Sequence, residues 1–288
     1  MDRTGIVTID ETIREGMQHS GIVFSYSQRE KILDFQEKLG VDICQAGYPS
    51  AHITEADNVK KLFLYALNKG YKIQVAGMGR AFMKDAQILL KTGINHFHLH
   101  AHIDMDQNKD RAEALSCIKE VIEYIIRKNK NAEISLAILD IGRTDPLILE
   151  ELSCFFIDNL KIDILSLPDT SGIMSPDSVY DKIFPIAKRA ANSETKISIH
   201  CHNDMGMASA NTIIGIKAGG KILEASALGI GERNGIADIF LTGKMLKDNG
   251  VEMNLKTDET EIFREYYQYV NEICRSQTGE SLLNLKVV

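Results

Sequence analysis

The chain has 288 residues, of which 44% are hydrophobic and 25% are charged, so it holds enough apolar material for a packed core. Forty acidic residues against 33 basic ones give a net charge of −7, and there is no long run of Lys or Arg. An acidic chain of this kind is not expected to have nucleic acid or an anionic membrane as its main partner.

The sequence shows no membrane or secretion signal. No apolar run approaches the roughly 20 residues that a membrane span needs, and the first four residues do not resemble a signal peptide. The five cysteines are odd in number and widely spaced, and they form no C-x-x-C pair. We therefore expect a reduced, cytoplasmic protein.

Short β-prone runs alternate with longer segments of helical spacing along the chain. Strands are predicted over residues 5–10, 41–46, 72–76, 96–102, 133–139, 162–167, 196–202 and 221–228. Helices are predicted after them, including 27–39, 56–69, 110–129, 146–159 and 237–249. Eight strand–helix units within about 250 residues are typical of a TIM (β/α)8 barrel. A doubly wound open sheet is the alternative, but no G-x-G-x-x-G follows the first strand.

No internal domain boundary is visible, because the chain has five prolines and no linker rich in Gly or Ser. We predict a barrel over residues 1–250 and a C-terminal helical extension over 251–288. The extension should contain a helix over 259–277, whose apolar stripe must be buried against the barrel or a second subunit. The stripe consists of Ile262, Phe263, Tyr266, Tyr267, Val270 and Ile273.

Polar clusters stand at the carboxyl ends of predicted strands, where barrel enzymes place their chemistry. In H-C-H-N-D at 200–204, His200 and His202 share one side of the strand and can chelate one divalent ion. The alternative is a pair of histidines held by hydrogen bonds in a polar barrel mouth.

In D-E-T-I-R-E-G-M-Q at 10–18, a carboxylate can complete a metal site and the Arg can stabilise charge on a substrate oxygen. A solvated, salt-bridged loop is the other interpretation.

Two more clusters, L-P-D-T-S-G at 167–172 and L-G-I-G-E-R-N-G at 228–235, follow the sixth and eighth strands. Each alone can be an ordinary turn, but four clusters at four strand ends favour a functional site.

Histidines also alternate along the fourth strand, at His96, His98, His100 and His102. The last three share a face and are expected at the barrel mouth. A second metal site, a modified substrate pocket and a set of hydrogen-bonded histidines are the open alternatives.

In this order the motifs resemble those of the DRE-TIM metallolyase superfamily, which also shows patterns like Q-A-G-Y-P at 45–49 and H-C-H-N-D-M-G at 200–206. Homocitrate and isopropylmalate synthases are the members that the sequence resembles most, with citramalate synthase nearby. The resemblance covers nearly the whole chain. It implies a catalytic barrel for the Claisen condensation of an acyl-CoA, usually acetyl-CoA, with a 2-oxo acid.

The resemblance also implies roles for single residues. Glu15, His200 and His202 match the ligands of a divalent metal, which can be Mg²⁺, Mn²⁺ or Zn²⁺. Arg14 matches the catalytic Arg.

Further positions match the substrate pocket, with departures. Gln18 and Thr170 match residues that line the 2-oxo acid pocket, and Arg143 is expected to bind substrate too. Leu139 stands where the family has a Glu, and Gln45 replaces the Glu that usually precedes A-G-[FY]-P.

By this resemblance, the synthases continue into a subdomain that supplies a catalytic His from a neighbouring subunit, whereas this sequence stops at Val288. We therefore expect a truncated relative that forms a homodimer without exchanging domains over the active site. The general base would then come from the barrel, and His102 is the best-placed candidate.

Two rival functions stay open. One is a carbon–carbon lyase or aldolase of the hydroxymethylglutaryl-CoA lyase type, which has a similar length but a Cys-bearing loop after the eighth strand that is absent here. The other is a barrel that binds a metabolite without turnover. Leu139 favours that second rival, whereas the intact Arg14 and metal-ligand pattern oppose it.

Overall fold

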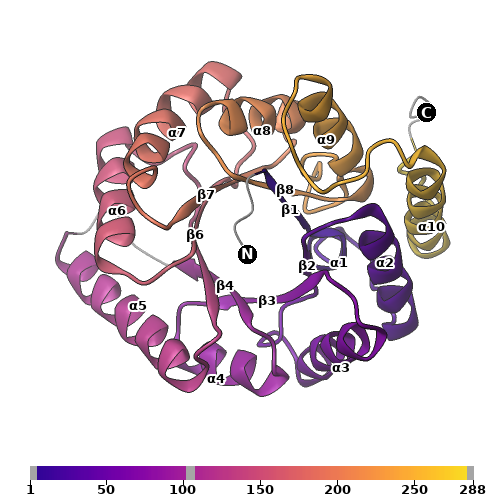
Figure 1. Ribbon diagram of the computed structural model, residues 1–288, viewed down its shortest axis with the longest axis horizontal. Helices are drawn as coiled ribbons and strands as arrows, with labels where there is room; N and C mark the ends of the chain where they lie inside the picture. Colours follow the sequence, from indigo (N-terminus) through magenta and orange to yellow (C-terminus); the bar gives the residue numbers. More distant parts are fainter. Residues whose placement is uncertain (1–4, 102–107, 284–288) are drawn as a thin grey trace.

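The computed structural model describes residues 5–101 and 108–283 and shows an eight-stranded parallel barrel ringed by helices (Figure 1). The strands are β1 (Val7–Asp10), β2 (Ile43–Gln45), β3 (Gln74–Arg80), β4 (His96–Ala101), β5 (Glu133–Ile138), β6 (Ile164–Asp169), β7 (Lys196–Cys201) and β8 (Ile222–Ala225). Each strand pairs with the next, and β8 pairs with β1 to close the barrel. The predicted TIM barrel is confirmed.

Helices follow the strands and form the outer ring. They are α2 (Tyr26–Leu39), α3 (Ile53–Lys69), α4 (Met83–Thr92), α5 (Asn108–Lys128), α6 (Pro146–Asn159), α7 (Pro176–Ala190), α8 (Ala208–Lys217) and α9 (Ile239–Asp248). Two short helices, α1 (Thr12–Gly16) and the 3₁₀ turn η1 (Ala227–Gly229), lie at strand ends, and α10 (Thr260–Thr278) follows the barrel. The helix ends carry ordinary signals: in α2 a capping box at Ser25 opens the helix and Gly40 at φ 73° ends it.

The third strand is longer than predicted because its glycines interrupt the β-prone pattern. β3 continues from the predicted end at Ala76 to Arg80, through Gly77 and Gly79. A Cβ at Gly77 would lie 2.7 Å from Ile94, and one at Gly79 would lie 2.9 Å from Leu89. Both glycines are therefore needed for α4 and the segment after it to pack against this strand.

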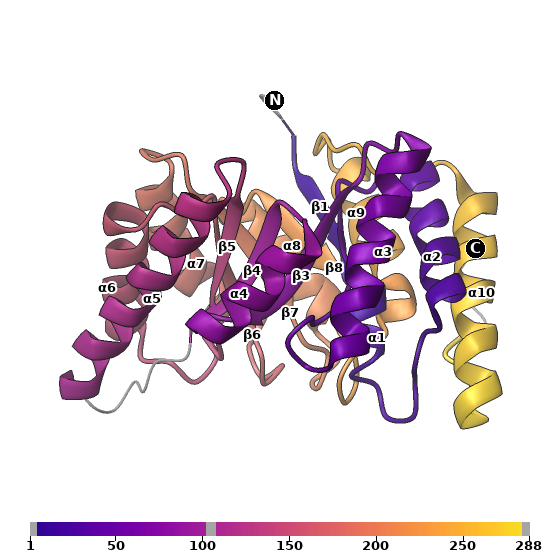
Figure 2. The same cartoon turned by 90° about the horizontal axis from the view of Figure 1, so that it is seen from below.

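The barrel interior is divided into an apolar and a polar half. A small cluster of buried side chains from β1, β2, β3, β6 and β8 forms a core separate from the large one beneath the helices: Val7, Ile9, Ile43, Ala76, Ile164 and Ile222. β1 begins at the upper end of the barrel in Figure 2 and α1, which follows it, lies at the lower end, so the carboxyl ends of the strands face the α1 side. The polar clusters predicted from the sequence lie at that end.

The C-terminal helix α10 lies outside the ring beside α2 and buries its apolar stripe within the chain (Figures 1 and 2). The Tyr266 ring stacks on Phe35 of α2 with centroids 5.4 Å apart. The Tyr266 hydroxyl donates to Asp10 Oδ2 at 3.0 Å, and the Tyr267 hydroxyl donates to Asp238 Oδ1 at 2.7 Å. Because Asp10 ends β1, this helix supports the strand end that leads into α1.

Replacing Tyr266 with Phe should lower the free energy of unfolding by about 1.5–3 kcal/mol, because a buried carboxylate loses a hydrogen-bond donor. Burial raises the pKa of Asp10 to about 6, although its hydrogen bonds, including that from Tyr266, act in the opposite direction. A raised pKa means that stability is lost as the pH rises through that value, and the variant raises it further. Urea unfolding should therefore show a larger loss at pH 8 than at pH 5.

Tyr269→Phe is the matched control for Tyr266→Phe. Tyr269 is on the same helix, is half-buried against Phe35, and forms no hydrogen bond through its hydroxyl within the described residues. Its replacement should change stability little. Equal losses in the two variants, or a loss in Tyr266→Phe that does not change with pH, would contradict the assignment.

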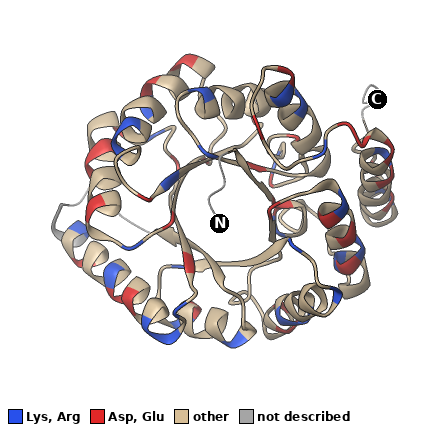
Figure 3. Cartoon of the chain, viewed as in Figure 1, with Lys and Arg blue, Asp and Glu red and all other residues tan. Residues whose placement is uncertain are grey.

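Acidic and basic residues alternate around the outer helices (Figure 3). Among the described helices, none is both long enough and apolar enough to span a membrane.

Candidate active site

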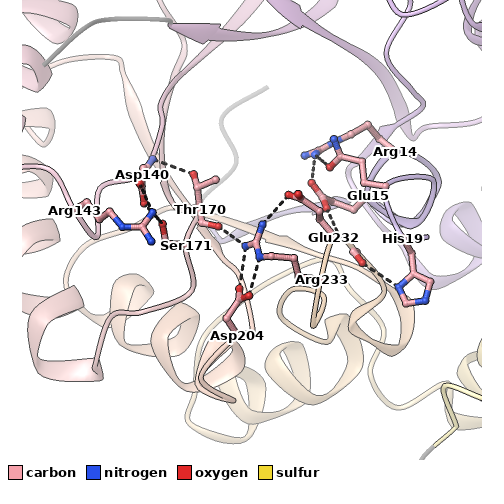
Figure 4. Close-up of polar contacts among 12 residues, drawn as sticks. Arg14, Glu15, His19, Asp140, Arg143, Thr170, Ser171, Asp204, Glu232 and Arg233 are labelled. Atoms are coloured by element: carbon pink, nitrogen blue, oxygen red, sulfur yellow. Dashed lines mark hydrogen bonds and ion pairs between the residues drawn. The ribbon is translucent and has the colours of Figure 1, made fainter.

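A pocket of about 160 Å³ lies at the carboxyl end of the barrel. Of the eight residues given a catalytic, substrate-binding or metal-binding role from the sequence, six line it: Arg14, Glu15, Gln18, Thr170, His200 and His202. Arg143 lies instead on the outer rim, where its side chain is 66% exposed and donates to Asp140 and Ser171 (Figure 4). His102 lies outside the described residues.

The short helix α1 carries the acidic and basic groups of the first motif into the pocket. The Thr12 backbone N–H donates to Asp10 Oδ1 at 2.8 Å, and the Thr12 hydroxyl accepts from the Ala227 N–H at 2.8 Å. These bonds tie the start of α1 to the ends of β1 and β8. Glu11, Arg14 and Glu15 are consequently buried rather than solvated, so the interpretation of this run as a salt-bridged surface loop is wrong.

Glu15, His200 and His202 form a buried group whose ligand atoms all lie within 4.8 Å of one another. The two imidazole centroids are 5.0 Å apart. Burial, helped by the nearby His200 and Arg233, lowers the pKa of His202 to about 2, which keeps this ring neutral. A neutral imidazole beside a carboxylate is a donor set that suits a divalent cation. His202 Nδ1 is also buried without a hydrogen-bond partner in the described chain.

Two further carboxylates, those of Glu11 and Glu224, lie beside His200. The His200 Nδ1 atom is 2.8 Å from Glu11 Oε2 and 3.2 Å from Glu224 Oε2. Glu224 also accepts hydrogen bonds from the hydroxyls of Ser166 at 2.8 Å and Ser198 at 2.5 Å. Burial opposes the charged form of His200, but the two carboxylates outweigh it and raise its pKa to about 9. Carboxylates placed behind a ligating imidazole orient the ring and increase its basicity.

The guanidinium of Arg14 connects these groups. It donates from Nε to Gln45 Oε1 and from Nη1 to Glu15, and it reaches Gln18 Oε1 at 3.0 Å and Glu11 Oε1 at 3.1 Å. An Arg has five N–H donors, and these contacts use four of them. The guanidinium is thus held in one orientation, with a proton left on Nη2 that could reach a substrate oxygen.

The rim of the pocket is held by Arg233, which donates to both carboxylate oxygens of Asp204 at 2.7 and 2.9 Å and to the Thr170 carbonyl oxygen (Figure 4). Arg233, Leu228 and Asp140 have φ angles of 54°, 59° and 58°, in the left-handed region that non-glycine residues rarely adopt. All three lie in segments that follow β5 and β8. Backbone strain at the carboxyl rim is a feature of functional sites.

Glu11, Gln45 and Glu224 also line the pocket, although the sequence predicted no role for them, and His98 and His100 line it as expected for the barrel mouth. A buried Glu in the apolar run of β8 was the available signal for Glu224. Burial lowers the pKa of His100 to about 4 and that of His98 to about 3, so both rings are neutral. His96, on the same strand face, pairs instead with Glu133 at 3.0 Å.

Comparison with known proteins identifies the family of the chain. The HMGL-like family model matches residues 6–265. A probable 2-isopropylmalate synthase of Methanosarcina acetivorans is 31% identical over 285 residues, which cover 97% of this chain and 52% of that protein. The homocitrate synthase AksA of the same organism is 30% identical over 268 residues, covering 91% and 64%. The chain therefore spans only part of the length of these relatives.

The solved structure of HMG-CoA lyase from Bacillus subtilis superposes with a TM-score of 0.77 at 18% identity, covering 99% of this chain and 97% of that one. At this identity the likeness concerns the fold alone. The family match extends over most of the chain, and the chain belongs to the HMGL-like family, the DRE-TIM barrels expected from its motifs.

Proposed function

We propose that the chain catalyses a divalent-metal-dependent Claisen condensation of an acyl-CoA, with acetyl-CoA the first candidate, and a 2-oxo acid. The observation that carries the proposal is the placement of Arg14 directly beside the buried Glu15, His200 and His202 group. The 2-isopropylmalate and homocitrate synthases among the relatives support this reaction class.

Each of these pocket residues has its own role in the proposed reaction. A divalent cation held by Glu15, His200 and His202 would supply Lewis-acid polarisation of the keto group. Arg14 would donate to the oxygen that becomes negative when the acyl-CoA enolate attacks the keto carbon. Gln18 and Thr170 would hydrogen-bond the carboxylate of the 2-oxo acid, and Arg143 would contact substrate from the rim. Hydrolysis of the thioester would then release free CoA.

Thiol release from acetyl-CoA tests the proposal, measured with a panel of 2-oxo acids and with Mg²⁺, Mn²⁺ or Zn²⁺ added. We expect release that depends on both the metal and one of the 2-oxo acids. Cleavage of 3-hydroxy-3-methylglutaryl-CoA in place of condensation would support the lyase alternative. If neither reaction occurs, metabolite binding without turnover remains.

We also propose His102 as the base that removes the acyl-CoA methyl proton, because it follows β4, two residues beyond the pocket-lining His100. His102→Ala should slow the exchange of acetyl-CoA methyl protons with deuterated solvent by about 10²–10⁴-fold, the usual contribution of general-base catalysis. NMR of the methyl signal measures that exchange. If the parent protein turns over and His102→Ala exchanges the methyl protons at the same rate as the parent, His102 is not the base.

The proposed assembly is a homodimer. Leu241 and Met245 on α9 are 45% and 53% exposed, which offers apolar surface for a second copy. Analytical ultracentrifugation should give twice the chain mass; a single-chain mass at micromolar concentration would contradict the proposal.

A further inference from the structure

Hydrogen bonds connect three pocket-lining side chains, from Arg14 through Gln45 to His98. Arg14 Nε donates to Gln45 Oε1, and Gln45 Nε2 lies 2.7 Å from His98 Nδ1. Because an Arg side chain can only donate, the amide oxygen of Gln45 must face Arg14 and the amide nitrogen must face His98. The amide therefore donates to His98 Nδ1.

An imidazole that accepts at Nδ1 carries its single proton on Nε2 when it is neutral. Burial lowers the pKa of His98 to about 3, which supports the neutral form. The proton position on His98 is thus fixed by Arg14, two side chains away. A Glu at position 45 would not impose this, because a carboxylate has no proton to donate to Nδ1.

His98 Nε2 is buried and has no hydrogen-bond partner within the described chain, although the side chain lines the pocket. A buried N–H group without an acceptor costs free energy, and native proteins almost always pair such groups. A donor left unpaired in a pocket wall is expected to find its acceptor on a ligand.

The place of His98 in the barrel indicates which part of a ligand would reach it. In the closed strand order β4 lies across from β8, whereas the candidate metal ligands follow β1 and β7. A 2-oxo acid held at those ligands by its carboxylate and keto oxygens would extend its side chain towards β4. Ser135, the register partner of His98 on β5, lines the same wall.

We propose that His98 Nε2–H is a specificity-determining donor that selects 2-oxo acids with an acceptor oxygen on the side chain over those with an alkyl side chain. This inference rests on the proposed function, since it takes a 2-oxo acid as the ligand.

Two pairs of isosteric 2-oxo acids test the preference. In 4-methoxy-2-oxobutanoate an ether oxygen replaces one methylene of 2-oxohexanoate, and in 2-oxoglutarate a carboxylate replaces the isopropyl group of 5-methyl-2-oxohexanoate. Titration calorimetry with MnCl₂ and no acyl-CoA gives each affinity. We expect the oxygen-bearing member of at least one pair to bind about tenfold tighter or more.

Three variants test whether the Nε2–H group of His98 causes the preference for oxygen-bearing 2-oxo acids. His98→Leu should abolish it, whereas His98→Gln, which places an amide donor near the Nε2 position, should keep part of it. His96→Leu is the matched control, because His96 shares the strand face but does not line the described pocket. Alkyl acids binding better in both pairs, or an unchanged preference in His98→Leu, would overturn the inference.

The proton position can be measured without any substrate. Two-bond ¹H–¹⁵N NMR of the histidine rings, assigned with His98→Gln, should show His98 with the proton on Nε2. A proton on Nδ1 would overturn the inference whatever the activity is. If instead the Nε2–H form is seen but neither 2-oxo acid binding nor thiol release occurs, the proposed function fails and the selection of 2-oxo acids fails with it.

Discussion

Arg14→Lys should reduce kcat for thiol release by on the order of 10²–10³-fold, the usual cost of losing one preorganised donor to a developing oxyanion. The guanidinium reaches four acceptors in fixed directions, on Gln45, Glu15, Gln18 and Glu11. A Lys ammonium keeps the charge but has three donors on one atom and no planar fork. It cannot hold the acidic groups in place and still donate to substrate.

The same variant should keep its fold and most of its metal affinity, because one positive charge remains beside Glu11 and Glu15. Arg189→Lys is the control for the exchange itself, since Arg189 pairs with Asp158 on the outer helices. Circular dichroism and metal titration separate a catalytic loss from misfolding. If Arg14→Lys turned over within a few-fold of the parent, Arg14 would not stabilise the transition state.

Local sequence patterns were sufficient to predict the barrel but not its irregular parts. The eight strands follow from β-prone runs separated by helical spacing. α1 was missed because five residues are too few to show a helical period. β8 ends at Ala225, three residues before the predicted end, because the chain turns into η1, where Leu228 takes φ 59°. Nothing in the residue type of Leu228 indicates that angle.

The candidate site could be predicted because its residues lie at the carboxyl ends of strands. Arg14, Glu15 and the two histidines stand at strand ends, which converge in a closed barrel. By contrast, the contacts of Glu224 with His200 and of Gln45 with His98 depend on strand register and side-chain direction. Glu224 and His200 lie on the paired strands β8 and β7, and Gln45 and His98 lie on β2 and β4 with β3 between them, so neither contact can be predicted from local sequence.

Two groups of ligand atoms share His200, and charge favours one of them as the metal site. Glu15, His200 and His202 form the first group, and Glu11, His200 and Glu224 form the second. Glu11, Glu15 and Glu224 together carry three negative charges, and Arg14 carries one positive charge. His200 must lose its proton to bind a metal, and with His200 neutral a single divalent cation would make the buried cluster neutral, whereas two would leave an uncompensated positive charge.

His202→Ala should accordingly lower the affinity for Mn²⁺ by on the order of 100-fold or more, because a three-residue site has no spare ligand. Glu224→Gln should lower it by at most about 10–100-fold, the effect expected of a group that only orients a ligating imidazole. Equilibrium dialysis with elemental analysis gives both affinity and stoichiometry. His19→Ala is the control, since His19 is hydrogen-bonded to the Gly231 carbonyl oxygen at 3.2 Å and belongs to neither group. If His202→Ala bound Mn²⁺ like the parent while Glu224→Gln lost it, the ion would be held by Glu11, His200 and Glu224, and the role proposed for His202 would have to be abandoned.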